Sequence, residues 1–283
     1  MNDRLELDAY LARIGREGRL APDVATLAAL LNAHVRAIPF EAIDPLLGRP
    51  VSLDLSVIQD KLVARRRGGY CFEQNLLFKA VLEQIGYAVV GLAGHVRWNA
   101  PPGAPLGPRT HMFLKVATAE GPYLVDVGFG GCLIDAPLRF ATGIEQRTAL
   151  GTFLLLQSEG LYELRANQPN GWRSLYVFTS EPQLLADYML GNCFASTSPL
   201  SPFTRHLTME RIVGDRRCRI VNRRLVTEAR DGERAVEREI GDAASLAKAM
   251  RIHFGMEPPA PPEEILARIA GRSKPPLGVT LRT

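Results

Sequence analysis

Three positions of the sequence carry the side-chain types that nucleophilic catalysis requires: a thiol, an imidazole and a carboxylate. Cys71 lies in "RRRGGYCFEQN", between a cationic, glycine-containing stretch and the start of an amphipathic helix. A nucleophilic cysteine needs a base, usually histidine, and the base needs a carboxylate or amide that orients it. His111 in "THMFLKV" and Asp126 in "YLVDVGFGG" supply these two groups. Together they could perform nucleophilic catalysis through a cysteine thiolate.

The residues around Cys71 favour a reactive thiol over a packing cysteine. At the start of a helix the unpaired N–H groups carry about half a positive charge, which stabilises a thiolate. Arg65, Arg66 and Arg67 would add cationic charge nearby. The two glycines allow a tight turn or a close approach to substrate, and one N–H group of the first helical turn could bind an oxyanion. A buried packing cysteine, the alternative, would need none of these neighbours.

The histidine and the aspartate are expected on neighbouring strands. His111 would stand at the start of one strand, and Asp126 would lie within the next strand, before a glycine-rich turn. A hairpin would then bring the two side chains together. An unpaired carboxylate inside the apolar run 123–127 would be costly, and a histidine supplies its partner. Taken singly, His111 could be a cap or a core histidine, and Asp126 could be an outward-facing strand residue.

The apolar periodicity divides the chain into three regions: a helical one, one of short strands, and a third with strands and helices. The third contains an Asp-Gly hairpin signal in "RDGER". The predicted helices are 7–14, 26–35, 57–65, the helix from about Phe72 to Gly86, 243–251 and 263–269. The predicted strands of the second region are 87–95, 112–116, 123–127, 153–157, 161–165 and 175–179, with a proline-rich, mobile loop at 99–109.

Composition and charge exclude several classes of protein. The 283 residues carry a formal net charge of +4 without a basic stripe interleaved with aromatics, so no nucleic-acid partner is expected. No apolar run approaches the roughly 18–20 residues of a membrane span, and the start "MNDRLELDAY" is too acidic and polar for a signal peptide. We therefore expect a cytoplasmic protein without a membrane partner. The four cysteines form neither a CxxC pair nor a zinc pattern with the five histidines, so no metal is expected.

Five segments, taken in order, resemble the arylamine N-acetyltransferases. They are "HVRAIPFEAID", "RGGYCFEQN", "THMFLKV", "VDVGFGG" and "NCFASTSPLSPF", and they span roughly residues 30 to 205. The resemblance implies an α+β fold: an N-terminal helical bundle (1–86) with the nucleophile, an antiparallel β-barrel (87–187) with the histidine and aspartate, and a C-terminal α/β lid (188–283). It also implies a cysteine-protease-like core in which Cys71, His111 and Asp126 form a catalytic triad.

The resemblance further implies a ping-pong reaction. Acetyl-CoA would acetylate the cysteine, CoA would leave, and an arylamine, arylhydrazine or arylhydroxylamine would accept the acetyl group. Acetyl-CoA would be the co-substrate, and the partners would be coenzyme A and a small arylamine. The residues near CoA would be Thr110, Gly128, Phe129 and Gly130. The walls of the acceptor pocket would be Phe40, Val96, Phe129 and Phe203.

The same motifs leave other functions open. Amide synthases that close macrocyclic antibiotics share this fold and triad, but they need an open acyl channel, whereas Phe40, Phe129 and Phe203 suggest a small aromatic pocket. A cysteine peptidase or transglutaminase-like hydrolase is a second alternative. Papain-type enzymes place the histidine about 130–150 residues after the cysteine, whereas the gap here is 40 residues. A non-enzymatic binding domain on the same fold is the third, and the intact triad argues against it.

Overall fold

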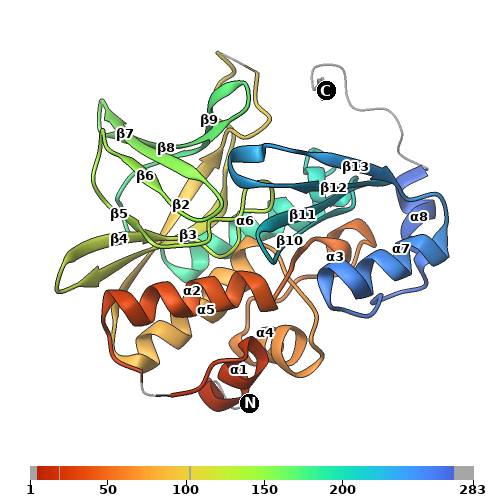
Figure 1. Cartoon of the computed structure of the whole chain (residues 1–283), viewed down its shortest axis with the longest axis horizontal. Coiled ribbons are helices and arrows are strands. Elements are labelled where there is room, and N and C mark those ends of the chain that lie inside the picture. Colours follow the sequence, from red (N-terminus) through yellow and green to blue (C-terminus); the bar gives the residue numbers. More distant parts are fainter. Residues whose placement is uncertain (1–4, 19, 102, 271–283) are drawn as a thin grey trace.

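The computed structural model describes residues 5–18, 20–101 and 103–270. Along the chain they form a mainly helical region, a region of strands, and a third region that contains both (Figure 1). The helices are α1 (Leu7–Ile14), α2 (Val24–Ala37), α3 (Ile43–Leu46), α4 (Leu55–Gln59), α5 (Cys71–Ile85), α6 (Leu185–Thr197), α7 (Ala243–Ala249) and α8 (Pro262–Ala270). The strands are β1 (Phe40–Glu41), β2 (Ala88–Val96), β3 (Arg109–Thr118), β4 (Gly121–Val125), β5 (Leu138–Arg139), β6 (Glu145–Arg147), β7 (Thr152–Ser158), β8 (Leu161–Gln168), β9 (Gly171–Phe178), β10 (Thr208–Val213), β11 (Arg216–Val221), β12 (Arg224–Glu228) and β13 (Val236–Glu239). Within the described ranges, no helix combines the length and the apolar character that crossing a membrane would take.

The N-terminal helices form a layer beneath the barrel strands in Figure 1. The Asp23 carboxylate caps α2 by accepting from the Thr26 N–H at 2.7 Å, which satisfies a donor that the helix itself leaves unpaired. Gly86 ends α5 in the left-handed conformation with φ of 108°, as the sequence predicts. The apolar face of α5 shares one core with α2 and with β3, through residues such as Leu77 and Leu114. This packing fixes the start of α5 against the barrel.

The second region is a nearly closed antiparallel barrel, which confirms the predicted architecture. Its eight strands pair in the order β5-β4-β3-β2-β9-β8-β7-β6. Aromatic and aliphatic side chains, including Phe113, Phe153 and Phe178, fill its interior. Strands β3 and β4 are adjacent and antiparallel, with Leu114 opposite Val125. The predicted hairpin therefore exists, and it brings the chain near His111 close to the chain that follows β4.

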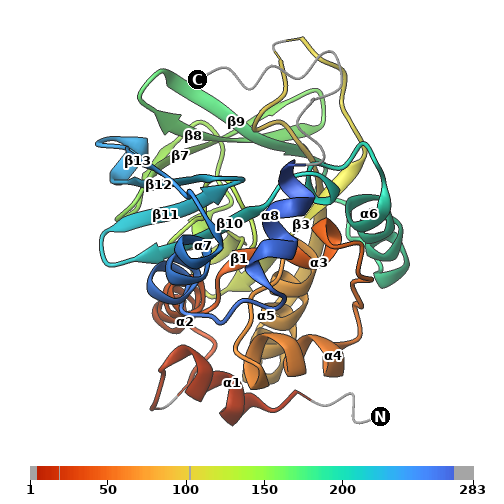
Figure 2. The same cartoon turned by 90° about the vertical axis from the view of Figure 1, so that its right-hand side faces the viewer.

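The third region is an antiparallel sheet covered by α7 and α8. The order β1-β10-β11-β12-β13 shows that its first strand comes from the helical region, with Phe40 opposite Glu210. Figure 2 shows β1 beside β10, and α7 and α8 supply part of the sheet's core through residues such as Leu246 and Ile265. The α+β fold with bundle, barrel and C-terminal α/β part is thus confirmed. The boundaries 1–86, 87–187 and 188–283 stay a prediction.

The structure confirms one local prediction, the hairpin at "RDGER", and contradicts another, the placement of Asp126. The "RDGER" signal is correct, because β12 and β13 pair antiparallel and Asp231 and Gly232 between them have φ of 53° and 75°. The placement of Asp126 within a strand is wrong, since β4 ends at Val125. The carboxylate of Asp126 accepts from the Gly128 N–H at 2.9 Å, and this side-chain bond turns the chain away from the sheet.

The loop at 99–109 is tied to the barrel by arginines. Arg97 donates to the carbonyls of Ala104 and Pro105 at 2.8 and 3.1 Å. Arg173 donates to the carbonyl of Trp98 at 2.6 Å and to the Asn99 side chain at 2.7 Å. The predicted mobility of this loop stays a prediction.

Candidate active site

Cys71 is the first residue of α5. At Gly68 and Gly69, shortly before it, the backbone passes so close to neighbouring atoms that a side chain larger than hydrogen would not fit. The residue before Cys71 donates its N–H to Glu73 Oε2 at 3.1 Å, which caps the helix. A Cβ atom on Gly68 would lie 2.1 Å from the Pro39 oxygen, and one on Gly69 would lie 2.8 Å from Glu73 Oε2. The two glycines therefore let the backbone pass close to Pro39 and Glu73, whereas the predicted tight turn or close approach to substrate stays a prediction.

The three predicted catalytic residues meet where α5 packs on β3. His111 Nε2 donates to Asp126 Oδ2 at 2.6 Å, and the Cys71 side chain lies close enough to the same imidazole to raise its pKa. Because Nε2 is engaged by the carboxylate, Nδ1 is the nitrogen left for the thiol. Cys71, His111 and Asp126 are 3%, 2% and 0% exposed, so their interactions lie in a largely water-free environment.

Four donors surround the carboxylate of Asp126, which explains how it can be buried. Besides His111, they are Asn75 Nδ2 at 3.2 Å, the Gly128 N–H at 2.9 Å and the Tyr176 hydroxyl at 3.1 Å. Each oxygen thus accepts two bonds, and none of its capacity is left exposed to an apolar wall. The aspartate is held in one orientation before any substrate arrives.

Asn75 joins the nucleophile to the aspartate and was not singled out from the sequence. Its amide Nδ2 contacts the carbonyls of Cys71 and Met112 at 3.1 and 2.8 Å, and its Oδ1 accepts from the Val127 N–H at 3.2 Å. The signal was available, because Asn75 follows Cys71 by one helical turn and so shares its face. For Tyr176, which comes from β9, the sequence offers no comparable signal.

The electrostatics of the site favour a charged histidine. Burial alone would lower the pKa of His111, but the charge and hydrogen bond of Asp126, with smaller contributions from Cys71, raise it from 6.5 to about 10. At neutral pH the ring is therefore an imidazolium whose free N–H faces the thiol. The imidazolium thus places a positive charge and a proton donor beside the thiol.

Of the predicted pocket residues, Phe129 packs directly against the triad. The ring of Phe129 meets that of His111 edge-on, with centroids 5.0 Å apart and planes at 85°. The ring centroids of Phe40 and Phe203 are 5.9 Å apart, and those of Phe203 and Tyr70 are 5.8 Å apart. A Cβ atom on Gly130 would lie 2.2 Å from the Phe40 ring, so Phe40 also touches the turn that carries Phe129.

The remaining candidates fall into different surroundings. Val96, at the end of β2, is 40% exposed and lies opposite Tyr176 in the sheet. The carbonyl of Thr110 accepts from the Cys71 thiol at 3.5 Å. A Cβ atom on Gly128 would lie 2.7 Å from the Cys71 Cα, so this glycine lets the turn after β4 pack directly on the nucleophile. The roles of these residues toward CoA and arylamine stay predictions.

The expected help of the arginines to Cys71 is wrong for two of the three. Arg65 pairs with Asp60 on the surface, and Arg67 pairs with Glu41 and Asp44. Carboxylates thus neutralise these two charges locally, so they add little positive potential at the thiol. Arg66 lies in another pocket, described below. Among residues whose surroundings the structure gives, the imidazolium of His111 and the N–H groups at the start of α5 are the positive groups that remain beside Cys71.

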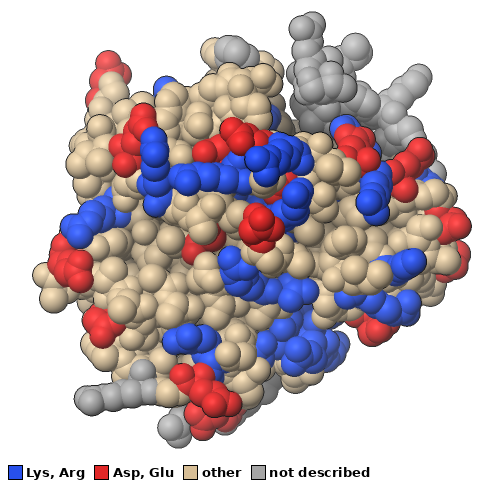
Figure 3. Space-filling view, in the orientation of Figure 1, with Lys and Arg blue, Asp and Glu red and all other residues tan. Residues whose placement is uncertain are grey.

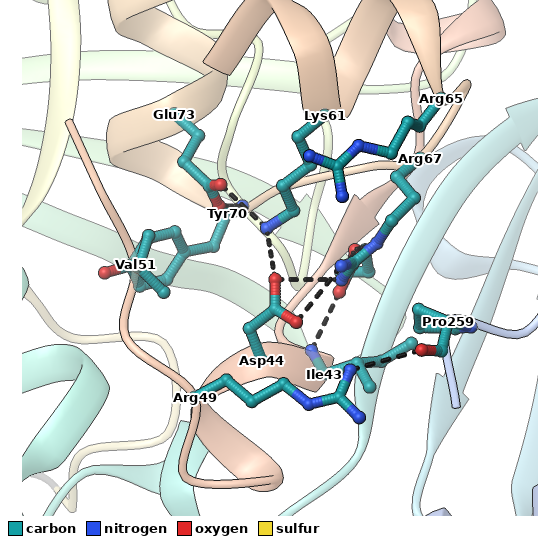
Figure 4. Close-up of polar contacts among 12 residues, drawn as sticks. Ile43, Asp44, Arg49, Val51, Lys61, Arg65, Arg67, Tyr70, Glu73 and Pro259 are labelled. Carbon is teal, nitrogen blue, oxygen red and sulfur yellow. Dashed lines mark hydrogen bonds and ion pairs between the residues drawn. The ribbon is translucent and has the colours of Figure 1, made fainter. Parts of the chain in front are cut away.

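Arg67 belongs to a buried ionic network that fixes the approach to Cys71 (Figure 4). Lys61 Nζ lies 2.8 Å from Asp44 Oδ2 and 2.7 Å from Glu73 Oε1, while Arg67 Nη2 lies 2.9 Å from Asp44 Oδ2 and 2.7 Å from Glu41 Oε1. The network links α3 to the first turn of α5 and to the loop that carries the two glycines. Arg67 therefore ties the chain that leads to Cys71 to Glu41 and Asp44.

The other three cysteines differ in exposure. Cys132 and Cys218 are buried, Cys193 is exposed, and all are free thiols. Burial raises the pKa of Cys132 to about 11, which makes it a poor nucleophile. No group of three or more His, Cys, Asp or Glu side chains suited to a metal ion occurs in the part of the chain that the structure describes.

Comparisons with known proteins agree with this geometry. A family model described as N-acetyltransferase matches residues 23–260. The arylamine N-acetyltransferase of Mycolicibacterium smegmatis is 40% identical over 256 residues, which are 89% of this chain and 92% of that protein. The arylamine N-acetyltransferase of Escherichia coli K12 is 39% identical over 250 residues, 88% of each chain.

A solved structure gives the same answer for the fold. The arylamine N-acetyltransferase of Mycobacterium marinum in complex with CoA superimposes with a TM-score of 0.89 at 39% identity, covering 94% of this chain and 99% of that one. The similarity in sequence and in structure therefore runs through all three regions and includes the segments that hold the triad. The chain belongs to the arylamine N-acetyltransferase family and is an acyltransferase.

Proposed function

We propose that this enzyme moves the acetyl group of acetyl-CoA to arylamines, arylhydrazines and arylhydroxylamines by a ping-pong reaction through an acetyl-cysteine at Cys71. The observation that carries the proposal is the buried cluster in which His111 bonds to Asp126 and lies close enough to Cys71 to interact with it. Use of acetyl-CoA is supported by the M. marinum relative, whose structure holds CoA. The hydroxylamine class is supported by a Salmonella typhimurium relative, 36% identical, named an arylamine N-acetyltransferase / N-hydroxyarylamine O-acetyltransferase.

The first half-reaction acetylates the enzyme. The Cys71 thiolate attacks the thioester carbonyl, and the N–H groups in the first turn of α5, which lack helical acceptors, can stabilise the oxyanion. The bond between the carbonyl carbon and the sulfur of CoA breaks, and the departing sulfur takes the proton from the His111 imidazolium. The products are acetyl-Cys71, a neutral histidine and CoA. Asp126 keeps Nδ1 of the ring aimed at the reacting sulfur throughout, because it holds Nε2.

The second half-reaction regenerates the enzyme. The acceptor nitrogen attacks the acetyl carbon, His111 takes the nitrogen's proton, and the bond to the Cys71 sulfur breaks. The thiolate and imidazolium are thus restored together. Aromatic amines suit this step because their nitrogen is neutral at pH 7, and a flat ring can pack against Phe129, Phe40 and Phe203. These rings also argue against the open acyl channel of a macrocycle-forming amide synthase.

Mass spectrometry after mixing the enzyme with acetyl-CoA alone tests the proposal. We expect one added acetyl group on the peptide that contains Cys71, and its loss when an arylamine such as aniline is added, with acetanilide as product. The exposed thiol of Cys193 is an internal control, since it should stay unmodified. Absence of the acetyl-Cys71 peptide, or its persistence in the presence of every amine, would contradict the ping-pong route. Release of free acetate instead would favour a hydrolase.

A further inference from the structure

A second group of charged side chains lines a surface pocket that contains no residue of the triad. The pocket has a volume of about 590 Å³ and opens between α1, α2, the chain at Arg66 and strand β10. Five arginines line it: Arg13, Arg16, Arg36, Arg66 and Arg211. Figure 3 shows basic side chains gathered over the ends of α1 and α2 on this face. We call this feature the arginine pocket.

The floor of the arginine pocket is made of small residues. Ala29, Ala33 and Ala37 line it at four-residue spacing along α2, and Gly15 lines it where α1 ends. Residues four apart share one face of a helix, so the three alanines leave a continuous shallow channel under the guanidinium groups. The hollow therefore follows from the sequence of α2, which keeps bulky side chains off this face.

Backbone carbonyls hold several of the arginines in place but do not neutralise them. Arg13 donates from Nε to the Leu62 carbonyl at 3.0 Å and from Nη1 to the Ala37 carbonyl at 2.8 Å. Arg36 donates to the Gly214 carbonyl at 2.6 Å, and Arg211 to the Arg36 carbonyl at 2.5 Å. These bonds order the side chains while leaving their positive charge uncompensated.

No carboxylate balances this charge among the residues that the structure describes. None of the five arginines has an Asp or Glu oxygen within 4.0 Å, although nine other arginines of the chain form such pairs. The Nε atom of Arg16 is buried and has no hydrogen-bonding partner. Burial and then the nearby charges of Arg66 and Arg211 lower the pKa of Arg13 to about 10. Mutual repulsion of this kind is relieved when an anion binds.

We propose that the arginine pocket binds a diphosphate group, either as free pyrophosphate or as part of a nucleoside diphosphate. Guanidinium groups match phosphate oxygens in paired hydrogen bonds, and two adjoining phosphates can engage several of them at once. The volume lies in the range of small-molecule sites. The site is separate from the acetyl-transfer centre and does not depend on the reaction proposed for it.

Calorimetric titration at constant ionic strength tests this site, with inorganic pyrophosphate and adenosine diphosphate as the probes. We expect saturable binding of at least one probe to the wild-type enzyme. In the double variant Arg16→Gln/Arg66→Gln the binding should be weaker by about tenfold or more, because two charge-assisted contacts are removed. The matched control is Arg224→Gln/Arg251→Gln, which removes the same charge from exposed ion pairs and should bind as the wild type does.

Three results would overturn the proposal: no saturable binding by the wild type, an equal loss in the control variant, or a loss of acetyl-CoA affinity as large as the loss of probe affinity. The last would make the pocket part of the co-substrate's site. The acetyl-CoA concentration dependence of Cys71 acetylation therefore belongs to the experiment. Circular dichroism of each variant shows whether the fold is kept.

A second variant tests the role of the positive charge in the arginine pocket without removing any arginine. Ala29→Glu places a carboxylate on the pocket floor, so it should abolish probe binding and raise the unfolding temperature by relieving the repulsion. Ala25→Glu, one turn earlier on the same face of α2 but outside the lining of the pocket, is its control and should bind the probes as the wild type does. Unaltered probe binding by Ala29→Glu would refute the site.

Discussion

Replacing Asp126 with asparagine changes one atom and should disable the site in two ways. Both oxygens of the Asp126 carboxylate accept hydrogen bonds, from His111, Asn75, Gly128 and Tyr176. In the asparagine variant one of these oxygens becomes an NH₂ group, which would face donors instead of accepting from them. If that group faces His111, it donates to Nε2 and forces the ring proton onto Nδ1. That nitrogen could then no longer take the proton of the thiol or of the amine.

The size of the effect follows from the pKa of His111, which Asp126 raises from 6.5 to about 10 against the effect of burial. With that value, all but roughly one molecule in a thousand carries the imidazolium at pH 7. Without the carboxylate, burial holds the pKa below 6.5, and less than about a quarter of the molecules would be charged. Together with the wrong tautomer, this predicts a fall in kcat/KM on the order of 10³–10⁴.

The same shift makes a prediction for stability against pH. Because the pKa of His111 is higher in the folded than in the unfolded protein, the pair with Asp126 stabilises the fold fully below about pH 6.5. This contribution, a few kcal/mol in size, is lost as the pH rises through about 10. Asp126→Asn should remove that pH dependence, so its unfolding free energy should change less than that of the wild type between these limits.

The assays are the acetylation rate of Cys71 by acetyl-CoA and urea unfolding at several pH values. Tyr176→Phe is the control, because it removes one hydrogen bond to Asp126 Oδ2 without changing the charge. It should keep the imidazolium and lose far less activity. Activity of Asp126→Asn within a few-fold of the wild type, or an unchanged stability profile, would refute the assignment of Asp126 as the group that orients and charges His111.

Three further predictions concern the nucleophile and the chain that positions it. Cys71→Ser should abolish acetyl transfer but leave circular dichroism and unfolding unchanged, because a hydroxyl is too weakly acidic to form the ion pair. Lys61→Met leaves buried Glu73 without its cation and Asp44 with Arg67 alone, and it should cost about 3–5 kcal/mol in urea unfolding. Lys79→Met, in an i,i+4 surface pair, should cost less than about 0.5 kcal/mol; equal losses would contradict the role of the network. Gly128→Ala pushes a methyl group against the nucleophile's backbone and should slow Cys71 acetylation on the order of 10²-fold, whereas Gly107→Ala, with open space around it, should leave the rate unchanged.

The triad and the two main helices at its base could be predicted because their signals are local. The end of α5 is marked by Gly86, whose left-handed backbone is a property of the residue itself, whereas α2 starts at Val24, two residues before the predicted start. The hairpin of β3 and β4 follows from two apolar runs separated by a short turn. When α5 packs against this hairpin, Cys71, His111 and Asp126 come together at the contact.

Contacts between segments that lie far apart in the chain could not be predicted from the sequence. Strand β1 has two residues and pairs with β10, so nothing in its own composition distinguishes it from a loop. The sheet of the third region therefore begins in the first, which no local pattern reveals. Likewise, Tyr176 bonds to Asp126 only because β9 pairs with β2 in the barrel. A tyrosine in a strand is ordinary until that register is known.

The run Arg65–Arg67 shows most clearly where sequence reasoning reaches its limit. Three identical side chains suggested a single cationic patch beside Cys71, yet they enter three environments. The backbone of Arg66 has φ of 53°, a left-handed conformation that ends the helical segment before it, with the Arg67 N–H bonded back to the Lys61 carbonyl. Arg65 then meets Asp60 at the surface, and Arg67 enters the ionic network under Cys71. Arg66 alone keeps an unneutralised charge, and it lines the arginine pocket rather than the catalytic centre.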